Sequence, residues 1–285
     1  MIDLHTHSTA SDGNLTPSQL VALAVQKKIS ILALTDHDTT AGLAEAEDAA
    51  NTLGIHLVRG IELNIDWPRG EFHLLGLGLQ QESKSLTDIC TSLQEGRVTR
   101  NREIMQKMKD DGFAVSYEEL LEFSGETTCI GRPHVAAYMI EKKICKHRQQ
   151  AFDKYLGKGR PYYVERTAAD LHDAIFAIQD SGGIPVLAHP LSLYVSWGKM
   201  NETLSDLQLA GIEGLEAWHS GVRVGEAMRL EEYARKLGFF VTAGSDFHGE
   251  HIRSDRKLGH TAGMREIEDR FWEEELRPAL ERKKA

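Results

Sequence analysis

Short apolar runs alternate with amphipathic stretches along the first 60 residues. Three apolar runs predict strands: 2–5, 29–35 and 55–59. Thr16 is predicted to cap the first intervening helix, because its hydroxyl can accept a hydrogen bond from a free N–H of the first turn. Gly54 is expected to end the second helix, over 40–53, in the left-handed conformation that glycine adopts readily. This alternation indicates an α/β protein with a parallel sheet.

The pattern changes after about residue 60. Apolar positions at 62–66 and 71–79 predict a hairpin that turns at Pro68, Arg69 and Gly70. From about residue 83, helical spacing continues without intervening strands over four stretches: 86–111, 117–123, 133–142 and 147–156. We therefore expect an all-helical subdomain at 83–164, inserted into a discontinuous core made of 1–82 and 165–285.

The alternation of strands and helices returns in the last part of the chain. Strands are predicted at 184–188, 214–217 and 239–243. Helices are predicted at 168–181, 203–210, 225–237 and 267–281. These segments extend the parallel sheet or close it into a barrel.

Composition excludes several classes of protein. Hydrophobic residues make up 41% of the chain and charged residues 27%, which is typical of a globular domain and excludes a disordered or collagen-like chain. The longest apolar runs are six residues, at 20–25 and 135–140, well below the roughly 20 that a membrane-spanning helix needs. His5 leaves no room for a signal peptide before it, so we expect a cytoplasmic protein. The net charge of -10 argues against stable binding of long DNA.

Polar clusters follow the predicted strands. They lie at 3–7, 35–38, 60–62, 188–190 and 244–248. All five stand at carboxyl ends of strands, where the loops of a parallel barrel or sheet converge on an active site. We therefore expect the clusters to form one site.

Histidines and carboxylates are concentrated in and near these clusters. Seven of the thirteen histidines and three acids fall there: His5, His7, His37, His73, His134, His189, His248, Asp12, Glu62 and Asp246. Alternate residues of an extended segment project to the same side, so His5 and His7 can grip one ion. The His-x-His spacing alone is weak evidence for a metal site. Together with the clustering of histidines and carboxylates at the strand ends, it indicates one. Imidazole and carboxylate donors without a thiolate favour manganese, zinc or iron.

Seven motifs, in this order, resemble those of the polymerase-and-histidinol-phosphatase (PHP) family of metal-dependent phosphoesterases. They are DLHTHSTASDG (3–13), LTDHDT (34–39), GIELN (60–64), FHLLG (72–76), GRPHVA (131–136), LAHP (187–190) and GSDFH (244–248). The resemblance spans nearly the whole chain. It implies a distorted (β/α)7 TIM-like barrel, the PHP fold, with two or three divalent metal ions, manganese before zinc or iron.

The resemblance also implies roles for single residues. The first ion would be held by His5, His7, Glu62 and Asp246, the second by a bridging Glu62 with His73 and His134, and the third by Asp12, His37 and His248. Asp246 and His189 would be catalytic, with His189 as general acid near the leaving group. A water bridging the ions would supply the attacking hydroxide, because divalent ions lower the pKa of bound water.

Within the family, the segment YLGKGRPYYV at 155–164 resembles the branch of small bacterial enzymes that act on nucleotides. That branch removes the 3'-phosphate from 3',5'-bisphosphate nucleotides or degrades short RNA from its 5' end. The implied partner is a small nucleotide or a short oligonucleotide. Six side chains would contact it: Arg132, Lys158, Arg160, Tyr162, His189 and His219. The alternative for the basic residues Lys154, Lys158, Arg160 and Arg166 and the tyrosines Tyr155, Tyr162 and Tyr163 is a solvated basic loop with the aromatic side chains packed beneath it.

Three other functions remain open. A phosphatase of the histidinol-phosphate type would keep the metal site and change the substrate. A catalytically idle interaction module would have lost ligands, whereas each predicted ligand position carries a competent side chain. Hydrolysis of a C–N bond by a related metal barrel would need a carboxylated lysine, and no lysine lies in the strand-end clusters. The number of subunits does not follow from the sequence.

Overall fold

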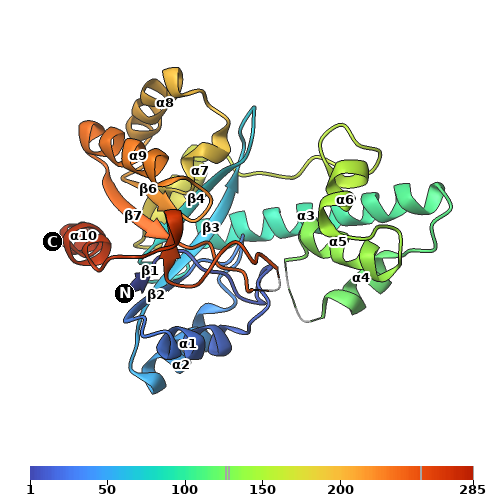
Figure 1. Ribbon diagram of the computed structural model, residues 1–285, viewed down its shortest axis with the longest axis horizontal. Coiled ribbons are helices and arrows are strands. Elements are labelled where there is room, and N and C mark those ends of the chain that lie inside the picture. Colours follow the sequence, from blue (N-terminus) through green and yellow to red (C-terminus); the bar gives the residue numbers. More distant parts are fainter. Residues whose placement is uncertain (126, 128, 251, 285) are drawn as a thin grey trace.

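The computed structural model describes residues 1–125, 127, 129–250 and 252–284 (Figure 1). Its centre is a seven-stranded sheet in which the order of the strands follows the chain. The strands are β1 (Ile2–Asp3), β2 (Ile31–Leu34), β3 (His56–Ile65), β4 (Phe72–Leu77), β5 (Ile184–Leu187), β6 (Gly214–His219) and β7 (Phe240–Gly244). β4 runs antiparallel to both of its neighbours, and the other pairs are parallel.

The sheet nearly closes on itself, because the segment after β1 meets the end of β7. The Leu4 amide donates a hydrogen bond to the Ala243 carbonyl at 3.4 Å. Just beyond, a parallel bridge pairs Thr6 with Phe247. The expected α/β barrel-like fold is confirmed.

One local strand prediction was wrong, because β3 is a single strand rather than two. Residues 56–59 pair with β2, whereas residues 60–65 pair with β4. The strand therefore changes its hydrogen-bonding partner halfway along. Its apolar pattern is interrupted at the same place, by Gly60 and Glu62, and this interruption resembles a strand boundary.

Helices cover the outside of the barrel (Figure 1). They are α1 (Pro17–Gln26), α2 (Leu43–Leu53), α7 (Leu171–Asp180), α8 (Trp197–Leu209) and α9 (Val224–Leu237). Thr16 caps α1 as predicted, since its hydroxyl accepts a hydrogen bond from the Gln19 amide at 3.2 Å. Gly54 ends α2 at φ 73°, also as predicted. α8 begins earlier than predicted, because Trp197 and Met200 extend its buried side toward the N-terminus.

The end of the chain is not one continuous helix over 267–281. Ile267 lies outside the helix, after a hairpin of β8 (His260–Thr261) and β9 (Arg265–Glu266). The helical part begins with a π-helical segment, η4 (Phe271–Leu276), and continues as α10 (Arg277–Lys284). Ile267, Phe271 and Leu276 are buried, although Ile267 is outside the helix, and Leu280 is only half-buried.

The helical insert stands beside the barrel, at the right of Figure 1. It consists of α3 (Lys84–Asp110), α4 (Tyr117–Ser124), α5 (Arg132–Glu141), α6 (Arg148–Ala151) and the π-helical η1 (Phe152–Leu156). Ile104 and Met108 of α3 pack into the insert's own hydrophobic core, whereas Leu86 and Leu93 pack into the barrel core. We therefore propose that the domain boundary falls inside α3 rather than at residue 83. None of the described helices is long and apolar enough to cross a membrane.

Candidate active site

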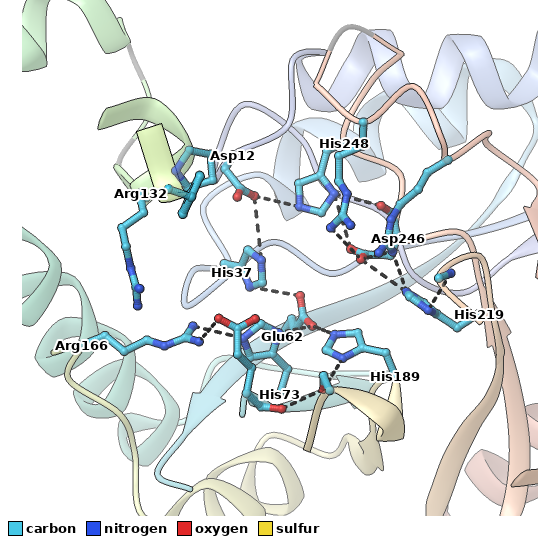
Figure 2. Close-up of a pocket in the computed structure, with 18 of the residues that line it drawn as sticks. Asp12, His37, Glu62, His73, Arg132, Arg166, His189, His219, Asp246 and His248 are labelled. Carbon is cyan, nitrogen blue, oxygen red and sulfur yellow. Dashed lines mark hydrogen bonds and ion pairs between the residues drawn. The ribbon is translucent and has the colours of Figure 1, made fainter. Parts of the chain in front are cut away.

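Most of the predicted metal ligands converge at one end of the barrel (Figure 2). They come from the loop after β1 (His5, His7, Asp12), from the loop after β2 (His37), from β3 (Glu62), from β4 (His73) and from the segment after β7 (Asp246, His248). Parallel strands bring their carboxyl ends to one face, and the antiparallel β4 contributes from the same region. Residues far apart in the sequence thus share one site.

A first group, His5, His7, Glu62 and Asp246, is buried. His7 Nε2 lies 3.2 Å from both Glu62 Oε2 and Asp246 Oδ1. His5 Nε2 lies 3.3 Å from the same Glu62 oxygen. Two imidazole nitrogens and two carboxylate oxygens therefore face a common point, which is a donor set suited to a divalent transition metal.

Glu62 also belongs to a second group, with His37 and His73. Glu62 Oε2 lies 3.0 Å from His37 Nδ1, and Glu62 Oε1 lies 2.9 Å from His73 Nδ1. Each oxygen of the carboxylate thus has an imidazole beside it. This geometry allows Glu62 to bridge two ions.

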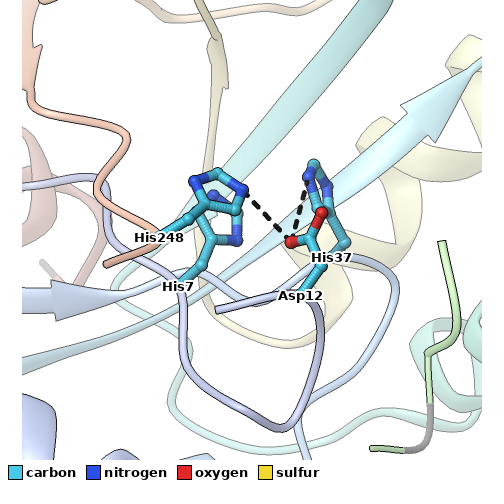
Figure 3. A group of neighbouring side chains, drawn as sticks. All are labelled: His7, Asp12, His37 and His248. Carbon is cyan, nitrogen blue, oxygen red and sulfur yellow. Dashed lines mark ion pairs between the residues drawn. The ribbon is translucent and has the colours of Figure 1, made fainter. Parts of the chain in front are cut away.

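A third group is formed by His7, Asp12, His37 and His248 (Figure 3). Asp12 Oδ1 lies 3.1 Å from His248 Nε2 and 3.9 Å from His37 Nε2. All the donor atoms of the group lie within 4.8 Å of one another, a spacing that one ion can span.

Buried atoms without hydrogen-bond partners indicate that the three groups fit bound cations. Asp12 Oδ1, His37 Nδ1 and Glu62 Oε2 are buried and have no hydrogen-bond partner in the described chain. An unsatisfied buried polar atom costs about 1–3 kcal/mol. Coordination of a cation would satisfy all three atoms, because each can offer a lone pair.

The charges of the cluster shift the pKa values of its members. Burial alone would raise the pKa of Glu62, but the neighbouring imidazoles, His37 first among them, lower it well below its usual value. Burial alone would lower the pKa of His7, but the adjacent carboxylates of Asp246 and Glu62 raise it to about 10. The carboxylates are therefore ionised and attract positive charge.

The loops that carry the ligands are held tightly. Asp36 accepts hydrogen bonds from the Ser8 amide at 2.8 Å and from the Ser11 hydroxyl at 2.5 Å, which fixes the loop after β1. A Cβ atom at Gly244 would lie 2.3 Å from His5 Cβ, so this position requires glycine. The motifs around the ligands therefore serve to place them.

His134 lies in the first turn of α5. Its Nδ1 accepts a hydrogen bond from the Gly131 amide at 3.0 Å and caps α5. Among the described residues, His134 belongs to none of the three groups. The expected set of Glu62, His73 and His134 is therefore not found. His189 stands beside Glu62 instead, with its Nε2 2.9 Å from Glu62 Oε1.

His189 is held in one orientation. Its backbone is at φ 27°, which is rare for a residue other than glycine, and its amide donates to Glu216 Oε2 at 2.8 Å. The Ser192 hydroxyl donates to the Glu71 carbonyl at 2.7 Å, so it must accept from His189 Nδ1, which is 2.9 Å away. His189 Nε2 is then the atom that faces Glu62 and can bind a cation or carry a proton.

Glu216 in β6 supports a second imidazole. Its Oε1 accepts a hydrogen bond from His5 Nδ1 at 2.9 Å. Because His5 Nδ1 carries the hydrogen, its Nε2 presents a lone pair to the first group. This role was not predicted, although a carboxylate at a strand end on the active face was visible in the sequence.

A cavity of about 480 Å³ opens over the ligand groups, between the barrel and the insert (Figure 2). Seven arginines line it: Arg97, Arg100, Arg132, Arg148, Arg166, Arg253 and Arg256. Arg97 pairs with Asp38, and Arg256 pairs with Asp246. Positive charge is thus concentrated here although the chain is acidic overall, and guanidinium groups bind phosphate oxygens well.

Half of the predicted substrate contacts lie at this cavity. Arg132, His189 and His219 line it. Lys158 and Arg160 do not line it and are exposed beyond η1. Tyr162 is buried in the insert core, where it stacks on Tyr155 and donates to Asp111 at 2.8 Å. Aromatic side chains packed under a solvated basic loop, the alternative for this segment, match these positions.

Most of the cavity arginines were not predicted. Arg97 and Arg100 are three residues apart in α3 and share one helix face, and this spacing was their one signal. Arg256 lies in the loop after β7, where no periodic pattern exists. Its place beside Asp246 depends on the path of that loop.

Comparison with known proteins agrees with this geometry. A family profile of the PHP domain matches residues 3–169. The chain is 34% identical over 282 residues to the 3',5'-nucleoside bisphosphate phosphatase of Chromobacterium violaceum, covering 98% of this chain and 99% of that protein. It is 35% identical over 247 residues to the 5'-3' exoribonuclease of Haemophilus influenzae, covering 86% of this chain and 89% of that protein.

A solved structure shows the same architecture. It is that of an amidohydrolase from Chromobacterium violaceum with bound sulfate, with a TM-score of 0.86, 33% identity and coverage of 99% of this chain and 96% of that chain. The likeness therefore extends over the barrel and the insert together. With its converging metal-ligand groups, the chain belongs to the PHP family and is a metal-dependent phosphoesterase.

Proposed function

We propose that the enzyme acts on nucleotides, removing the 3'-phosphate of 3',5'-bisphosphate nucleotides and acting on the 5' ends of short RNA. The seven arginines around the cavity carry this proposal. They lie on both walls, so that a substrate with two phosphate groups can be held at both. The names of the two relatives, a nucleoside bisphosphate phosphatase and an exoribonuclease, support the same substrate class.

Two or three divalent metal ions, manganese first, would be held by the three ligand groups. The first would take His5, His7, Glu62 and Asp246; the second Glu62, His73 and His37; the third Asp12 and His248 with His7 or His37. When bound, such ions polarise the phosphoryl oxygens and make a coordinated water more acidic. Glu62 is the carboxylate shared between the first two groups.

The barrel wall and the insert wall of the cavity have different tasks. On the barrel side, Arg256 pairs with Asp246, and Arg253 Nη1 lies 3.7 Å from Asp246 Oδ2. Both guanidinium groups can contact a phosphate bound at the ligand groups. On the insert side, the Arg132 guanidinium lies over the Tyr163 ring at 5.4 Å. Stacking leaves the N–H edge of Arg132 available for a second phosphate.

Apolar side chains complete the cavity. Phe152 of η1, Leu191 and Val222 line it together with the charged groups. A small-molecule site commonly combines such apolar surface with a few convergent polar groups. These three side chains offer contact to the base or ribose, the role that Tyr162 was expected to have.

His189 Nε2 has two proposed roles, because it faces both Glu62 and the cavity. As a ligand, it would join His73 on Glu62 in the place expected for His134. As an acid, it would give a proton to the leaving oxygen. Its Nδ1 hydrogen is bound to Ser192 in either case.

The proposal is tested by phosphate release after chelation and readdition of manganese. Adenosine 3',5'-bisphosphate, 5'-phosphorylated di- and trinucleotides, and histidinol phosphate are compared at equal concentration. We expect selective turnover of the nucleotides. Preference for histidinol phosphate would contradict the nucleotide proposal, and silence on all substrates would support an idle module.

A further inference from the structure

The insert and the rest of the chain carry opposite charge. Residues 83–164 contain 14 Lys and Arg and 11 Asp and Glu, whereas the remaining residues contain 19 and 32, giving +3 against -13. The excess is concentrated in residues 143–160, which we call the basic segment, with six Lys and Arg and one Asp. The segment runs from the end of α5 through α6 and η1 to the turn after η1.

Most cations of the basic segment are exposed, and none of them is in an ion pair with a described carboxylate. Five of the six have exposed side chains: Lys143, Lys146, Lys154, Lys158 and Arg160. No ion pair with a described carboxylate involves any of the six, Arg148 included. Elsewhere, surface cations often have partners, such as Lys84 with Asp88 and Lys236 with Glu232. The segment therefore keeps its charge available to an external anion.

The basic segment is continuous with the active-site cavity. Arg148 and Phe152, which lie inside the segment, line the cavity. Arg148 donates to the Ile252 carbonyl at 3.1 Å, which fastens the start of α6 to the barrel. After η1, the turn is held by the stacked rings of Tyr155 and Tyr162, with centroids 5.7 Å apart. The exposed cations thus lie on a firmly held support that begins at the cavity wall.

The size of the cavity limits what can lie inside it. A volume of about 480 Å³ falls in the lower part of the range of about 300–1,000 Å³ for small-ligand sites. It is suited to one terminal nucleotide and not to several. The remainder of a longer strand must lie outside the cavity, and its phosphates require positive charge along the path they take.

We propose that the basic segment binds the backbone phosphates of an RNA strand whose terminal nucleotide occupies the cavity. The inference rests on the proposed nucleotide function and deepens it, because it makes an oligonucleotide a better substrate than a mononucleotide. A strand held in this way has a salt-dependent affinity, since each phosphate contact with a single strand contributes a slope of about 0.7 in log affinity against log salt. Continuity with the cavity favours RNA over an anionic membrane as the partner.

The test compares two double variants with the same change in charge. Lys146→Ser/Lys154→Ser removes two cations of the basic segment. Lys27→Ser/Lys199→Ser removes two exposed cations of the barrel, at the end of α1 and in α8, as the control. For each manganese-loaded protein, kcat/KM is measured on a 5'-phosphorylated RNA ten-mer and on adenosine 3',5'-bisphosphate, at low and high salt.

We expect the ratio of kcat/KM for the ten-mer to that for the bisphosphate to fall about fivefold in the segment variant at low salt. The control variant should keep the wild-type ratio, and the difference should shrink at high salt. An unchanged ratio in the segment variant, or an equal fall in the control, would overturn the proposal.

A binding measurement separates this inference from the proposed function. The affinity for a fluorescein-labelled RNA ten-mer is measured by anisotropy in the Asp246→Asn background, with and without the segment substitutions. Weaker binding caused by the segment substitutions alone supports the RNA path even if the wild type hydrolyses no nucleotide. Equal RNA affinity of the Asp246→Asn protein with and without the segment substitutions would overturn the inference. Tighter binding to phosphatidylserine vesicles than to the RNA would overturn it as well.

Discussion

The barrel face and the helical insert contribute to one cavity by different physical means. On the barrel face, most of the imidazoles and carboxylates are buried; Glu216 orients His5, and Asp36 fixes the loop after β1 that carries ligands. On the insert, guanidinium groups line the wall, and the exposed lysines of the basic segment continue beyond it. Buried groups that are held in fixed orientations are suited to binding metal ions and catalysing hydrolysis. Accessible cations are suited to binding an anionic substrate. Because these groups lie in different parts of the chain, we expect that catalysis and substrate choice can be altered separately.

The largest effect should come from the barrel face. Asp246→Asn should lower kcat by about a thousandfold or more, beyond the 10–100-fold typical of residues that only support a ligand. The backbone at Asp246 is at φ 53°, which asparagine tolerates, so the fold should persist. Phosphate release measures kcat, and circular dichroism measures whether the fold persists. Near wild-type turnover would contradict the metal-site assignment.

A smaller loss should follow from removal of the support behind a ligand. Glu216→Gln places an amide against His5 Nδ1 and the His189 amide, where both carboxylate oxygens accept hydrogen bonds. We expect metal affinity, measured by titration of the metal-free enzyme with manganese, to fall about 10–100-fold. Glu213→Gln, at an exposed position just before β6, is the matched control. The same fall in both variants would remove this role from Glu216.

His189 and His134 provide a direct test of the second ion. His189→Asn should lower metal content or slow esters with poor leaving groups more than activated aryl esters, depending on its role. His134→Asn should leave metal content unchanged, because His134 caps α5 and belongs to none of the three ligand groups found among the described residues. Elemental analysis and a leaving-group series distinguish the outcomes. Loss of metal from the His134 variant alone would restore the original ligand set.

On the insert, Arg132→Gln should raise the KM for adenosine 3',5'-bisphosphate about tenfold, because a charged hydrogen bond to a phosphate is worth about 1.5–3 kcal/mol. Arg102→Gln is the matched control, since Arg102 also lies over a tyrosine ring, at 5.1 Å from that of Tyr117, but outside the cavity. Steady-state kinetics measure both. An equal change in the two variants would mean that Arg132 has no specific contact.

The smallest effect should be structural. Tyr162→Phe removes the hydrogen bond to Asp111 inside the insert and should lower the free energy of unfolding by about 1 kcal/mol, measured in urea. The KM for nucleotides should not change, because Tyr162 lies outside the cavity. A raised KM without loss of stability would return Tyr162 to the substrate site.

Local sequence patterns were sufficient to predict the barrel, a helical insert and most of the candidate ligands. Apolar periodicity marks strands and helices locally, and the polar residues that follow strands reach one face in any parallel barrel. Caps such as Thr16 and Gly54 are equally local, since they involve only residues of the same turn. These features could be predicted because each depends on a short stretch of chain or on a general rule of topology.

The packing of the folded chain sets which side chains come into contact. His134 was expected beside Glu62 from its motif, but the start of α5 uses its Nδ1 as a cap, and His189 reaches Glu62 from the loop after β5. The cavity arginines come from α3, α5, α6 and loops, whose approach depends on how the insert packs against the barrel. Distances between segments far apart in the chain are set by that packing, and local pattern carries no record of it.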